Sequence, residues 1–445
     1  MQKCSRNFIA NYFPNASREH PLTDYENAIK ALNSLQSNAE YIKNAQQERL
    51  SHPEEFSKTI LQAQKYLIRS GINLETLDEL PVIHVAGTKG KGTTCALCES
   101  ILRQHGLRTG FYSSPHMLEV RERILFLLEK VDVAIIEVGI GGEYDSTNIL
   151  RKVPIVGITS LGLDHTSILG DTIEKIAWHK AGIMKPGCQA FTVPQQSKAM
   201  KIIEDRSIEL KSTLQVVEPF LSSSLLKNSN GPTDIFNMNA SLAVTLAQAW
   251  LNLKTETQVN IINSEETKLG LLKCKWPGRY QIVHDINTFY LDGAHTPESI
   301  EVCVQWFKKE TQKSTHKKIL IFNVTGDRDS KDLLNKLRAC SFEEVYFVPN
   351  KATKNDKEDN QNFNIGTDKQ MARCYVHHNL WIELEHTNNT YSKAQLVKVL
   401  PSVLEAIQEC NNANCSLLIT GSLHLVGAAL SIIDPQLKVF GNNTT

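Results

Sequence analysis

The 445-residue chain is long enough for two or three domains, each with its own hydrophobic core. Its 48 basic residues balance its 48 acidic residues, so no long-range field draws it to nucleic acid or to an anionic membrane. Hydrophobic residues at 41% and charged residues at 22% are typical of a globular protein, and no apolar run approaches transmembrane length. We therefore expect no nucleic-acid partner and no membrane span.

The N-terminal extension, residues 1–22, is basic, and no acidic residue precedes Glu19. This composition fits a mitochondrial transit segment or the loose terminus of a cytoplasmic protein. Residues 23–26 (Thr-Asp-Tyr-Glu) form a capping box that predicts a first helix. A second helix is predicted over 54–70, ending at Gly71.

A glycine-rich loop follows the apolar, β-branched strand that begins at Val82, and a helix is predicted after it over 95–104. The loop consists of Gly87, Thr88, Lys89, Gly90, Lys91, Gly92 and Thr93. Glycines allow backbone N–H groups to surround phosphate oxygens, and the helix N-terminus adds a favourable dipole. We expect Lys91 to neutralise the β- and γ-phosphates of a nucleotide and the Thr93 hydroxyl to reach Mg²⁺. The usual pattern has no glycine between lysine and threonine, so a glycine-rich turn with a chance lysine is the alternative.

Ten cysteines are scattered along the chain, and Cys95 and Cys98 form a Cys-x-x-Cys pair on the predicted helix. No second pair stands at zinc spacing. Core packing in a reducing compartment is therefore favoured over redox or metal chemistry.

Strands and helices alternate through the next part of the chain. Strands are predicted over 109–112, 131–138, 153–159 and 190–193, with helices from Met117 and over 171–184. Such alternation predicts a largely parallel sheet with right-handed crossovers. Residues 219–234 are predicted to form a loop, and residues 239–251 a helix.

A second alternating pattern begins after Lys275, where Trp276-Pro277-Gly278-Arg279 interrupts the chain. Strands are predicted over 288–291, 318–322 and 345–348, with helices over 297–309 and 331–340. Residues 350–390 are predicted to be an irregular surface excursion, and a last helix and strand precede Thr420. The predicted fold class is α/β, with a phosphate-loop domain expected to bind ATP at 23–275 and a smaller Rossmann-like domain at 276–445.

Polar residues follow the predicted strands where ligands bind in parallel sheets, beyond the carboxyl ends. Ser114, Glu137 and His165 lie there, and oxygen ligands suit a hard cation that bridges phosphates. Taken singly, an acid at a strand end often caps a turn, and a lone histidine is often a satisfied polar group. Their shared location beside the phosphate loop favours a metal site.

The sequence resembles the folylpolyglutamate synthase family of Mur-ligase-like, ATP-dependent amide-forming enzymes. The matching stretches are 85–93, 113–116, 137–142 with Asp145-x-Thr147-Asn148, 163–166, 174–183, 276–279, 291–296, 325–329 and 420–424. The resemblance implies that ATP phosphorylates the γ-carboxylate of a folate's glutamate tail. The amine of L-glutamate then attacks the acyl phosphate, and ADP and phosphate leave.

The resemblance also implies roles for residues. Ser114, Glu137 and His165 match Mg²⁺ ligands, and Lys180 matches a lysine that carries a carbamate. The expected catalytic residues are Lys91, Glu137, His165 and Lys180. Nucleotide contacts beyond the loop are implied for Asn239, Arg279, Asp292 and His295. The expected cofactors are ATP and Mg²⁺, with a monovalent cation as a further candidate, and we expect a monomer.

Two departures from the family pattern leave alternatives open. Family members carry a few tens of residues between the Arg121–Ile124 stretch and the strand from Val131, and this chain lacks them. Residues 233–236 (Thr-Asp-Ile-Phe) replace a Gly-Glu-His-Gln stretch. A weakened nucleotide binder and another Mur-type amide ligase are therefore the alternatives to the folate ligase.

Overall fold

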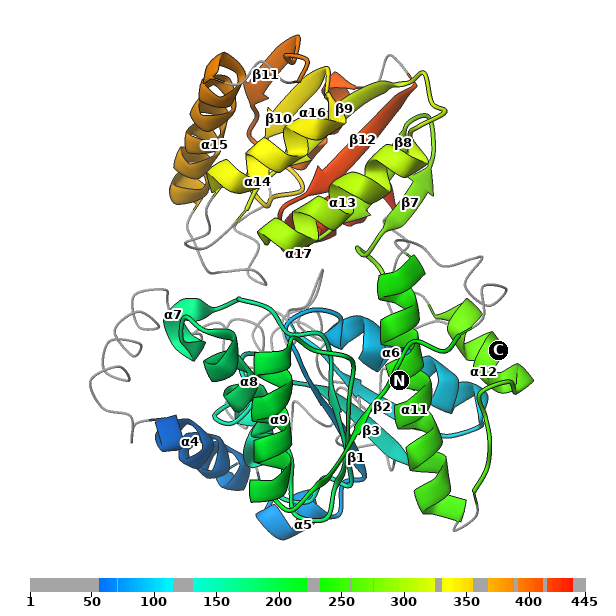
Figure 1. Cartoon of the computed structure of the whole chain (residues 1–445). Coiled ribbons are helices and arrows are strands. Elements are labelled where there is room, and N and C mark those ends of the chain that lie inside the picture. Colours follow the sequence, from blue (N-terminus) through cyan, green and yellow to red (C-terminus); the bar gives the residue numbers. More distant parts are fainter. Residues whose placement is uncertain are drawn as a thin grey trace, which may run out of the picture.

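The computed structural model describes residues 56–69, 71–114, 131–221, 233–255, 258–274, 276–324, 330–354, 367–387, 391–410 and 414–434. Figure 1 shows two α/β units, one above the other. Each unit is built on its own six-stranded sheet. This confirms the predicted fold class. The predictions for residues 1–22, for the helix opened at 23–26 and for the helix after Met117 lie outside the described residues.

The first unit contains sheet A, in which all neighbouring strands are parallel and follow the order β2-β3-β1-β4-β5-β6. Its strands are β1 (Val82–Ala86), β2 (Thr109–Tyr112), β3 (Val133–Glu137), β4 (Ile155–Ile158), β5 (Gln189–Thr192) and β6 (Thr213–Val216). Its helices are α4 (Phe56–Arg69), α5 (Leu74–Asp78), α6 (Lys91–Gln104), η3 (Ser146–Ile149), α7 (Thr166–Leu169), α8 (Ile173–Ala181), α9 (Ser197–Glu209), α11 (Thr233–Thr255) and α12 (Glu265–Lys273).

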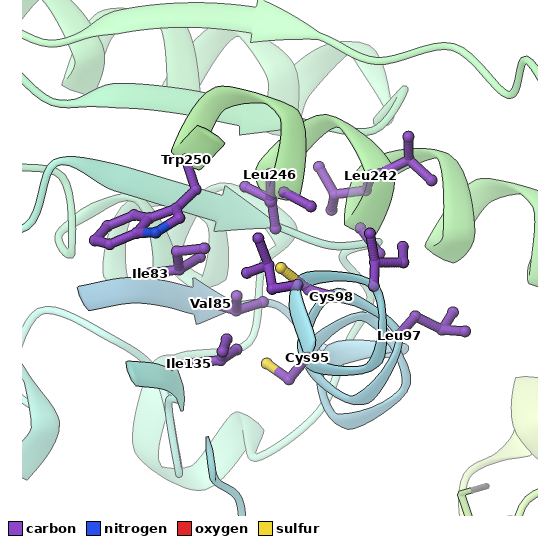
Figure 2. Packing of buried hydrophobic residues seen from close by; sticks show 14 of the residues in the cluster. Ile83, Val85, Cys95, Leu97, Cys98, Ile135, Leu242, Leu246 and Trp250 are labelled. Atoms are coloured by element: carbon purple, nitrogen blue, oxygen red, sulfur yellow. The ribbon is translucent and has the colours of Figure 1, made fainter. Parts of the chain in front are cut away.

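Strand β1 lies inside sheet A, and all five of its residues are buried. On one face, Ile83 and Val85 pack against α6 and α11 in a core that includes Leu246 and Trp250 (Figure 2). Cys95 and Cys98 belong to this core, and all nine described cysteines are free thiols. The prediction that this Cys-x-x-Cys pair is core packing is confirmed. The opposite face of the sheet packs against α8 and α9.

Strands β2 and β3 pair in parallel, with Thr109 opposite Val133. The sheet therefore closes across the short connection that precedes Val131, as a crossover of about a dozen residues allows. The connecting residues 115–130 lie outside the described part of the chain.

The second unit contains sheet B, ordered β11-β10-β9-β12-β8-β7, with β7 antiparallel to β8 and the other pairs parallel. Its strands are β7 (Gln281–His284), β8 (Thr288–Asp292), β9 (Lys317–Phe322), β10 (Glu344–Phe347), β11 (Leu396–Val399) and β12 (Cys415–Thr420). Its helices are α13 (Pro297–Glu310), α14 (Ser330–Leu337), η4 (Arg338–Cys340), α15 (Thr367–Thr387), α16 (Val403–Glu409) and α17 (Leu423–Ile433). Residues of α13, α14 and α15 pack in one core and residues of α16 and α17 in the other.

The prediction that residues 350–390 form an irregular excursion is wrong, because α15 occupies Thr367–Thr387. Four of its buried side chains, Cys374, His377, Trp381 and Leu384, recur every three or four residues and form a stripe. The stripe contains only one aliphatic residue, so a count of apolar residues does not reveal it. The indole N–H of Trp381 donates to Glu385 Oε1 at 2.8 Å, which allows this large side chain to be buried.

Helix boundaries differ at two further places. Helix α6 starts at Lys91, four residues before the predicted start, because Gly90 adopts a left-handed conformation (φ 85°) at the N-cap. Helix α11 starts at Thr233, so residues that were predicted as loop form its first turn. Several elements were not predicted, among them α5, α7, α9, α12, α17, β6, β7 and β11. Across the described ranges, no helix is both long and apolar enough to cross a membrane.

Candidate active site

The phosphate loop connects β1 to α6 at the carboxyl edge of sheet A. The backbone N–H groups of Thr88 and Lys89 both donate to Ser160 O, at 3.0 and 3.1 Å, which anchors the first half of the loop to the chain after β4. The first helical bond joins Thr94 N–H to Gly90 O at 2.8 Å. An α-helix leaves its first N–H groups without helical acceptors. Lys91, Gly92 and Thr93 carry such groups, so this end of α6 is where an anion would bind.

The glycine that separates Lys91 from Thr93 is explained by its neighbours. A Cβ on Gly92 would lie 2.8 Å from Trp276 Cζ2 and 3.3 Å from Glu137 Oε2. Trp276 stands at the entrance to the second unit and makes an edge-to-face contact with Phe111, with centroids 5.5 Å apart. The indole therefore packs on the first turn of α6, where a side chain would displace it.

Glu137 ends β3 and is 5% exposed. Its Oε1 lies 4.0 Å from Lys91 Nζ, and its Oε2 accepts the N–H of Ser114 at 3.3 Å. Burial raises the pKa of this carboxyl, while the Lys91 ammonium opposes the shift. The structure thus brings Lys91, Glu137 and Ser114 together, as predicted.

His165 is held by a different part of the site. It caps the short helix α7 in a left-handed conformation (φ 51°), and its Nε2 lies 4.0 Å from Asp164 Oδ2. Asp164 Oδ2 in turn lies 3.9 Å from Lys89 Nζ. His165 is therefore connected to the phosphate loop through Asp164 and Lys89, whereas Ser114 and Glu137 are connected through Lys91.

The donor set can be compared with the needs of Mg²⁺. In the described part of the chain, no three His, Cys, Asp or Glu side chains gather closely enough to enclose an ion. Mg²⁺ is usually bound by one or two carboxylates together with substrate phosphates and water. Glu137, a single buried carboxylate beside the phosphate loop, fits that kind of shared site.

Lys180 lies beneath the phosphate loop. It is 4% exposed on α8, and its Nζ donates to Gly87 O at 2.7 Å. Burial lowers its pKa well below the usual value, and the nearby Lys91 ammonium lowers it further. Burial thus favours the uncharged amine of Lys180 at its contact with the loop, as it does for lysines held away from water.

Asn239 is the residue of α11 that packs against the phosphate loop. A Cβ on Gly90 would lie 2.2 Å from Asn239 Oδ1, so the amide packs directly on that glycine. The replaced residues at 233–236 form the helical turn before it, and Phe236 packs against the core. The replacement leaves α11 continuous and Asn239 at the phosphate loop.

The second unit presents Arg279, Asp292 and His295 near the carboxyl end of β8. Asp292 is buried, and its two oxygens accept the N–H groups of Tyr280 (3.0 Å) and Ala294 (2.9 Å). His295 Nδ1 lies 2.7 Å from Gly293 O and therefore carries the proton. Arg279 lies close enough to Glu137 to lower the pKa of that carboxyl, so its charge reaches across to the first unit.

Several residues beside the loop carried no signal of their own in the sequence. Thr296 accepts a hydrogen bond of 2.7 Å from Lys89 Nζ. Thr159 lies against Gly87, where a Cβ would be 1.8 Å from its Oγ1. Thr296 ends the matching stretch 291–296 and is the N-cap before Pro297, but neither feature indicates a contact with the first unit.

In comparisons with known protein families, each of the two units matches a different family model. The Mur ligase middle domain matches residues 85–215, and the dihydrofolate synthetase C-terminal domain matches residues 279–432. The mitochondrial folylpolyglutamate synthase of Bos taurus is 34% identical over 94% of each chain. The Homo sapiens protein of the same name is 33% identical over 94% of this chain and 93% of its own length.

The bovine alignment extends over 559 positions, more than the 445 residues of this chain. The relative therefore carries residues that have no counterpart here.

Solved structures share the fold at lower identity. The Mycobacterium tuberculosis folylpolyglutamate synthase complexed with ADP and AMPPCP superposes with a TM-score of 0.64 at 19% identity, over 88% of this chain and 99% of that one. E. coli FolC in complex with DHPP and ADP superposes with a TM-score of 0.63 at 24% identity, over 82% and 91% of the two chains.

Proposed function

This chain belongs to the folylpolyglutamate synthase family, and we propose that it is an ATP-dependent ligase that adds glutamate to the γ-carboxylate of folates through an acyl phosphate. The observation that carries the proposal is the junction of the two units. Lys91, Glu137 and Lys180 surround the phosphate loop, and Lys89 reaches Thr296 of the second unit. Phosphoryl transfer needs alignment and charge neutralisation more than a nucleophile from the protein.

The phosphate loop would bind the nucleotide. The open N–H groups at the start of α6 would surround the phosphates, and Lys91 would neutralise the group that is transferred. Lys89 and Arg279 add positive charge from the loop and from the second unit. Solved family members hold ADP or AMPPCP, which supports ATP as the co-substrate of this chain.

A Mg²⁺ ion would be held by Glu137 and Ser114, with His165 as a further ligand. The Thr93 hydroxyl, in the first turn of α6, would also reach the ion. The ion would supply neutralisation of charge on the phosphates. The chain's own contribution is to fix Glu137: burial and the Ser114 N–H hold its carboxylate beside Lys91.

Lys180 would carry a carbamate. The C–N bond forms when the lone pair of an uncharged amine adds to the carbon of CO₂, one C=O electron pair moves onto oxygen, and one N–H proton passes to water. The lowered pKa of the buried Lys180 amine favours this reactive, uncharged form. The product would replace a buried amine with an anion beneath the phosphate loop.

The second unit would complete the nucleotide site through Arg279, Asp292 and His295, with Asn239 from α11. The two backbone bonds of Asp292 fix the loop that carries His295. We further propose a boundary between the units at residues 275–276, a monomeric enzyme, and a cytoplasmic or mitochondrial location. The mitochondrial relatives support the last alternative.

The proposal is tested with purified protein, ATP, Mg²⁺, tetrahydrofolate and glutamate. ADP should form in proportion to the polyglutamate product measured by chromatography. ATP hydrolysis indifferent to both folate and glutamate would contradict the proposal. Stimulation by a different carboxylate acceptor would instead identify another Mur-type amide ligase.

A second candidate function is a nucleotide binder with weak turnover. It is favoured by the residues that the bovine relative carries and this chain lacks. The two candidates differ in folate affinity, which can be measured directly.

A further inference from the structure

A buried histidine interrupts the apolar strand β1. His84 is fully buried, and the other four residues of Val82–Ala86 are aliphatic. Its Nε2 lies 2.9 Å from Thr147 Oγ1, whereas its Nδ1 has no hydrogen-bond partner. Burial of an unpaired nitrogen is unfavourable. An aliphatic side chain would fill the position without that cost, so packing alone does not account for the histidine.

The direction of the hydrogen bonds follows from the next contact. Thr147 Oγ1 lies 2.6 Å from Asp145 Oδ1, and an ionised carboxylate can only accept. The hydroxyl therefore donates to Asp145 and accepts from His84 Nε2–H. Burial lowers the pKa of His84 to about 3, and the Lys185 ammonium contributes, so the ring is neutral and its one proton is on Nε2.

Asp145 holds the turn that follows Glu137. Its Oδ1 also accepts the Thr147 N–H at 2.9 Å, and its Oδ2 accepts the Ile140 N–H at 2.9 Å. A Cβ on Gly139 would lie 3.1 Å from Asp145 Oδ2 and 3.6 Å from Ser114 Oγ. The carboxylate and the Ser114 hydroxyl therefore both lie against Gly139, two residues after Glu137.

The end of this turn nearest Glu143 is held by other contacts. The Glu143 N–H donates to His179 O at 2.7 Å, and Asn148 Nδ2 donates to Glu143 O at 2.9 Å. These contacts tie the turn to α8, the helix of Lys180. The Asp145 carboxylate itself contacts the end nearest Glu137 and Ser114, through Ile140.

We propose that His84 and Thr147 are positioning residues, which hold Asp145 against the turn at 139–142 and thereby place Glu137 and Ser114 for phosphate chemistry. The proposal rests on the proposed ligase function. The strand supplies a rigid base, and each hydrogen bond removes a rotational freedom from the next group. Small misplacements of catalytic groups are costly in rate, so such a chain has a functional use.

The first test compares Thr147→Val with Thr147→Ser. Valine keeps the shape but breaks both side-chain hydrogen bonds, and kcat should fall about 10- to 100-fold. Serine retains the hydroxyl and should restore kcat to within about threefold of the parent. Thr311→Val in the second unit is the matched control, because Thr311 is a buried threonine whose hydroxyl donates to Phe307 O at 2.7 Å. It should lower the melting temperature without changing kcat.

His84 is tested in the same way. His84→Gln keeps an N–H near the position of Nε2, whereas His84→Met removes it at similar size. We expect methionine to lower kcat and glutamine to restore most of it. The double variant His84→Met/Thr147→Val should be no slower than Thr147→Val, since both changes break one chain.

A binding measurement separates this inference from the proposed activity. AMPPCP affinity is measured by calorimetry with and without Mg²⁺. Thr147→Val should reduce the gain in affinity from Mg²⁺ about tenfold and leave the Mg²⁺-free affinity unchanged. An unchanged Mg²⁺ gain, or a Thr311→Val variant as slow as Thr147→Val, would overturn the positioning role. Lack of folate-dependent turnover in the parent would overturn the proposed function and leave this readout intact.

Discussion

The side-chain ammonium of Lys89 donates a hydrogen bond of 2.7 Å to the hydroxyl of Thr296. Thr296 is the N-cap of α13, and its hydroxyl also accepts the Ser299 N–H at 3.4 Å. A residue of the phosphate loop is thus attached to the first helix of the second unit. Nucleotide phosphates would compete with Thr296 for the same ammonium, so we expect nucleotide binding to be coupled to this contact between the units.

The pKa of Lys89 predicts a pH dependence of nucleotide binding. Burial lowers this pKa to about 8, although the Asp164 and Glu298 carboxylates oppose the shift. Phosphates favour the charged amine, so binding raises the pKa and takes up a proton wherever the free amine is neutral. AMPPCP affinity should therefore be flat below pH 7 and fall above pH 8, by up to about tenfold per pH unit.

Calorimetry from pH 6.5 to 9.5, in buffers that differ in ionisation enthalpy, measures both the affinity and the proton uptake. Lys89→Arg is the control, because arginine stays charged across this range. This substitution should remove the decline in AMPPCP affinity above pH 8. Equal slopes for the parent and Lys89→Arg would show that another group causes the dependence.

A second prediction concerns the carboxylate at the end of β3. Glu137→Gln is nearly isosteric and retains an oxygen for the Ser114 N–H, so the fold should survive. It removes the negative charge proposed to face Mg²⁺, which should cost several kcal/mol of transition-state stabilisation, or about 100-fold or more in kcat.

Steady-state kinetics and thermal melting test the effect of Glu137→Gln. Glu385→Gln is the matched control, because Glu385 is a buried glutamate in the second unit that accepts from Trp381 Nε1 and the Ala394 N–H. Near-parental kcat for Glu137→Gln would mean that Glu137 is only a structural residue at a strand end.

Gly92 provides a third prediction. Glycine-to-alanine changes within helices usually stabilise by about 0.5–1 kcal/mol. Here the new Cβ would lie 2.8 Å from Trp276 Cζ2, so the sign should reverse, with a loss of about 1–3 kcal/mol in unfolding free energy. Denaturant unfolding measures this change in unfolding free energy. Gly92→Ala/Trp276→Leu should recover part of the loss, and additive effects of the two changes would rule out this contact as the cause.

The parts of the fold that the sequence predicted share a strong local pattern. Strand β2 was predicted at its observed bounds, and β1, β3 and β4 within about two residues, because buried parallel strands are continuous apolar runs. Helix α15 was missed because its buried stripe contains His377 and Trp381 rather than a row of aliphatic residues. Strand β6 is a mostly exposed edge strand, and it lacks the apolar run.

The candidate site, too, could be predicted from the sequence only in part. The phosphate loop and Glu137 follow from glycine spacing and from an acid at a strand end. Contacts between distant segments leave no such mark: Thr296 is 207 residues from Lys89, and His84 is 63 residues from Thr147. Only the folded chain shows these pairs.

The carbamate proposed for Lys180 gives a fourth prediction. The protein equilibrated with ¹³C-bicarbonate should show a carbamate carbonyl resonance that is absent from Lys180→Met. The same variant should lose about 10- to 100-fold in kcat, with partial rescue by acetate or propionate. Lys185→Met is the control, because burial also lowers the pKa of Lys185, whose Nζ donates to Asn148 Oδ1 at 2.7 Å. A resonance that persists in Lys180→Met would assign the carbamate elsewhere.

The last prediction separates nucleotide binding from folate binding. The residues proposed for the phosphate side lie together in the described part of the chain: Lys91 Nζ is 4.0 Å from Glu137 Oε1, and Lys180 Nζ donates to Gly87 O of the loop. The resemblance to the family pattern predicts that the missing residues belong to the connection between Ser114 and Val131, on the acceptor side of the site. Lost surface there would weaken folate binding and alignment while leaving nucleotide binding unaffected.

We therefore expect ATP to bind with ordinary affinity, and tetrahydrofolate to bind at least about tenfold more weakly than to the bovine relative under the same conditions. Turnover should be correspondingly slow. Separate calorimetric titrations of AMPPCP and tetrahydrofolate, with the bovine enzyme in parallel, measure both affinities. Micromolar folate binding, together with glutamate addition at an ordinary enzymatic rate of about 1–100 s⁻¹, would show that the shortened chain is a fully competent ligase.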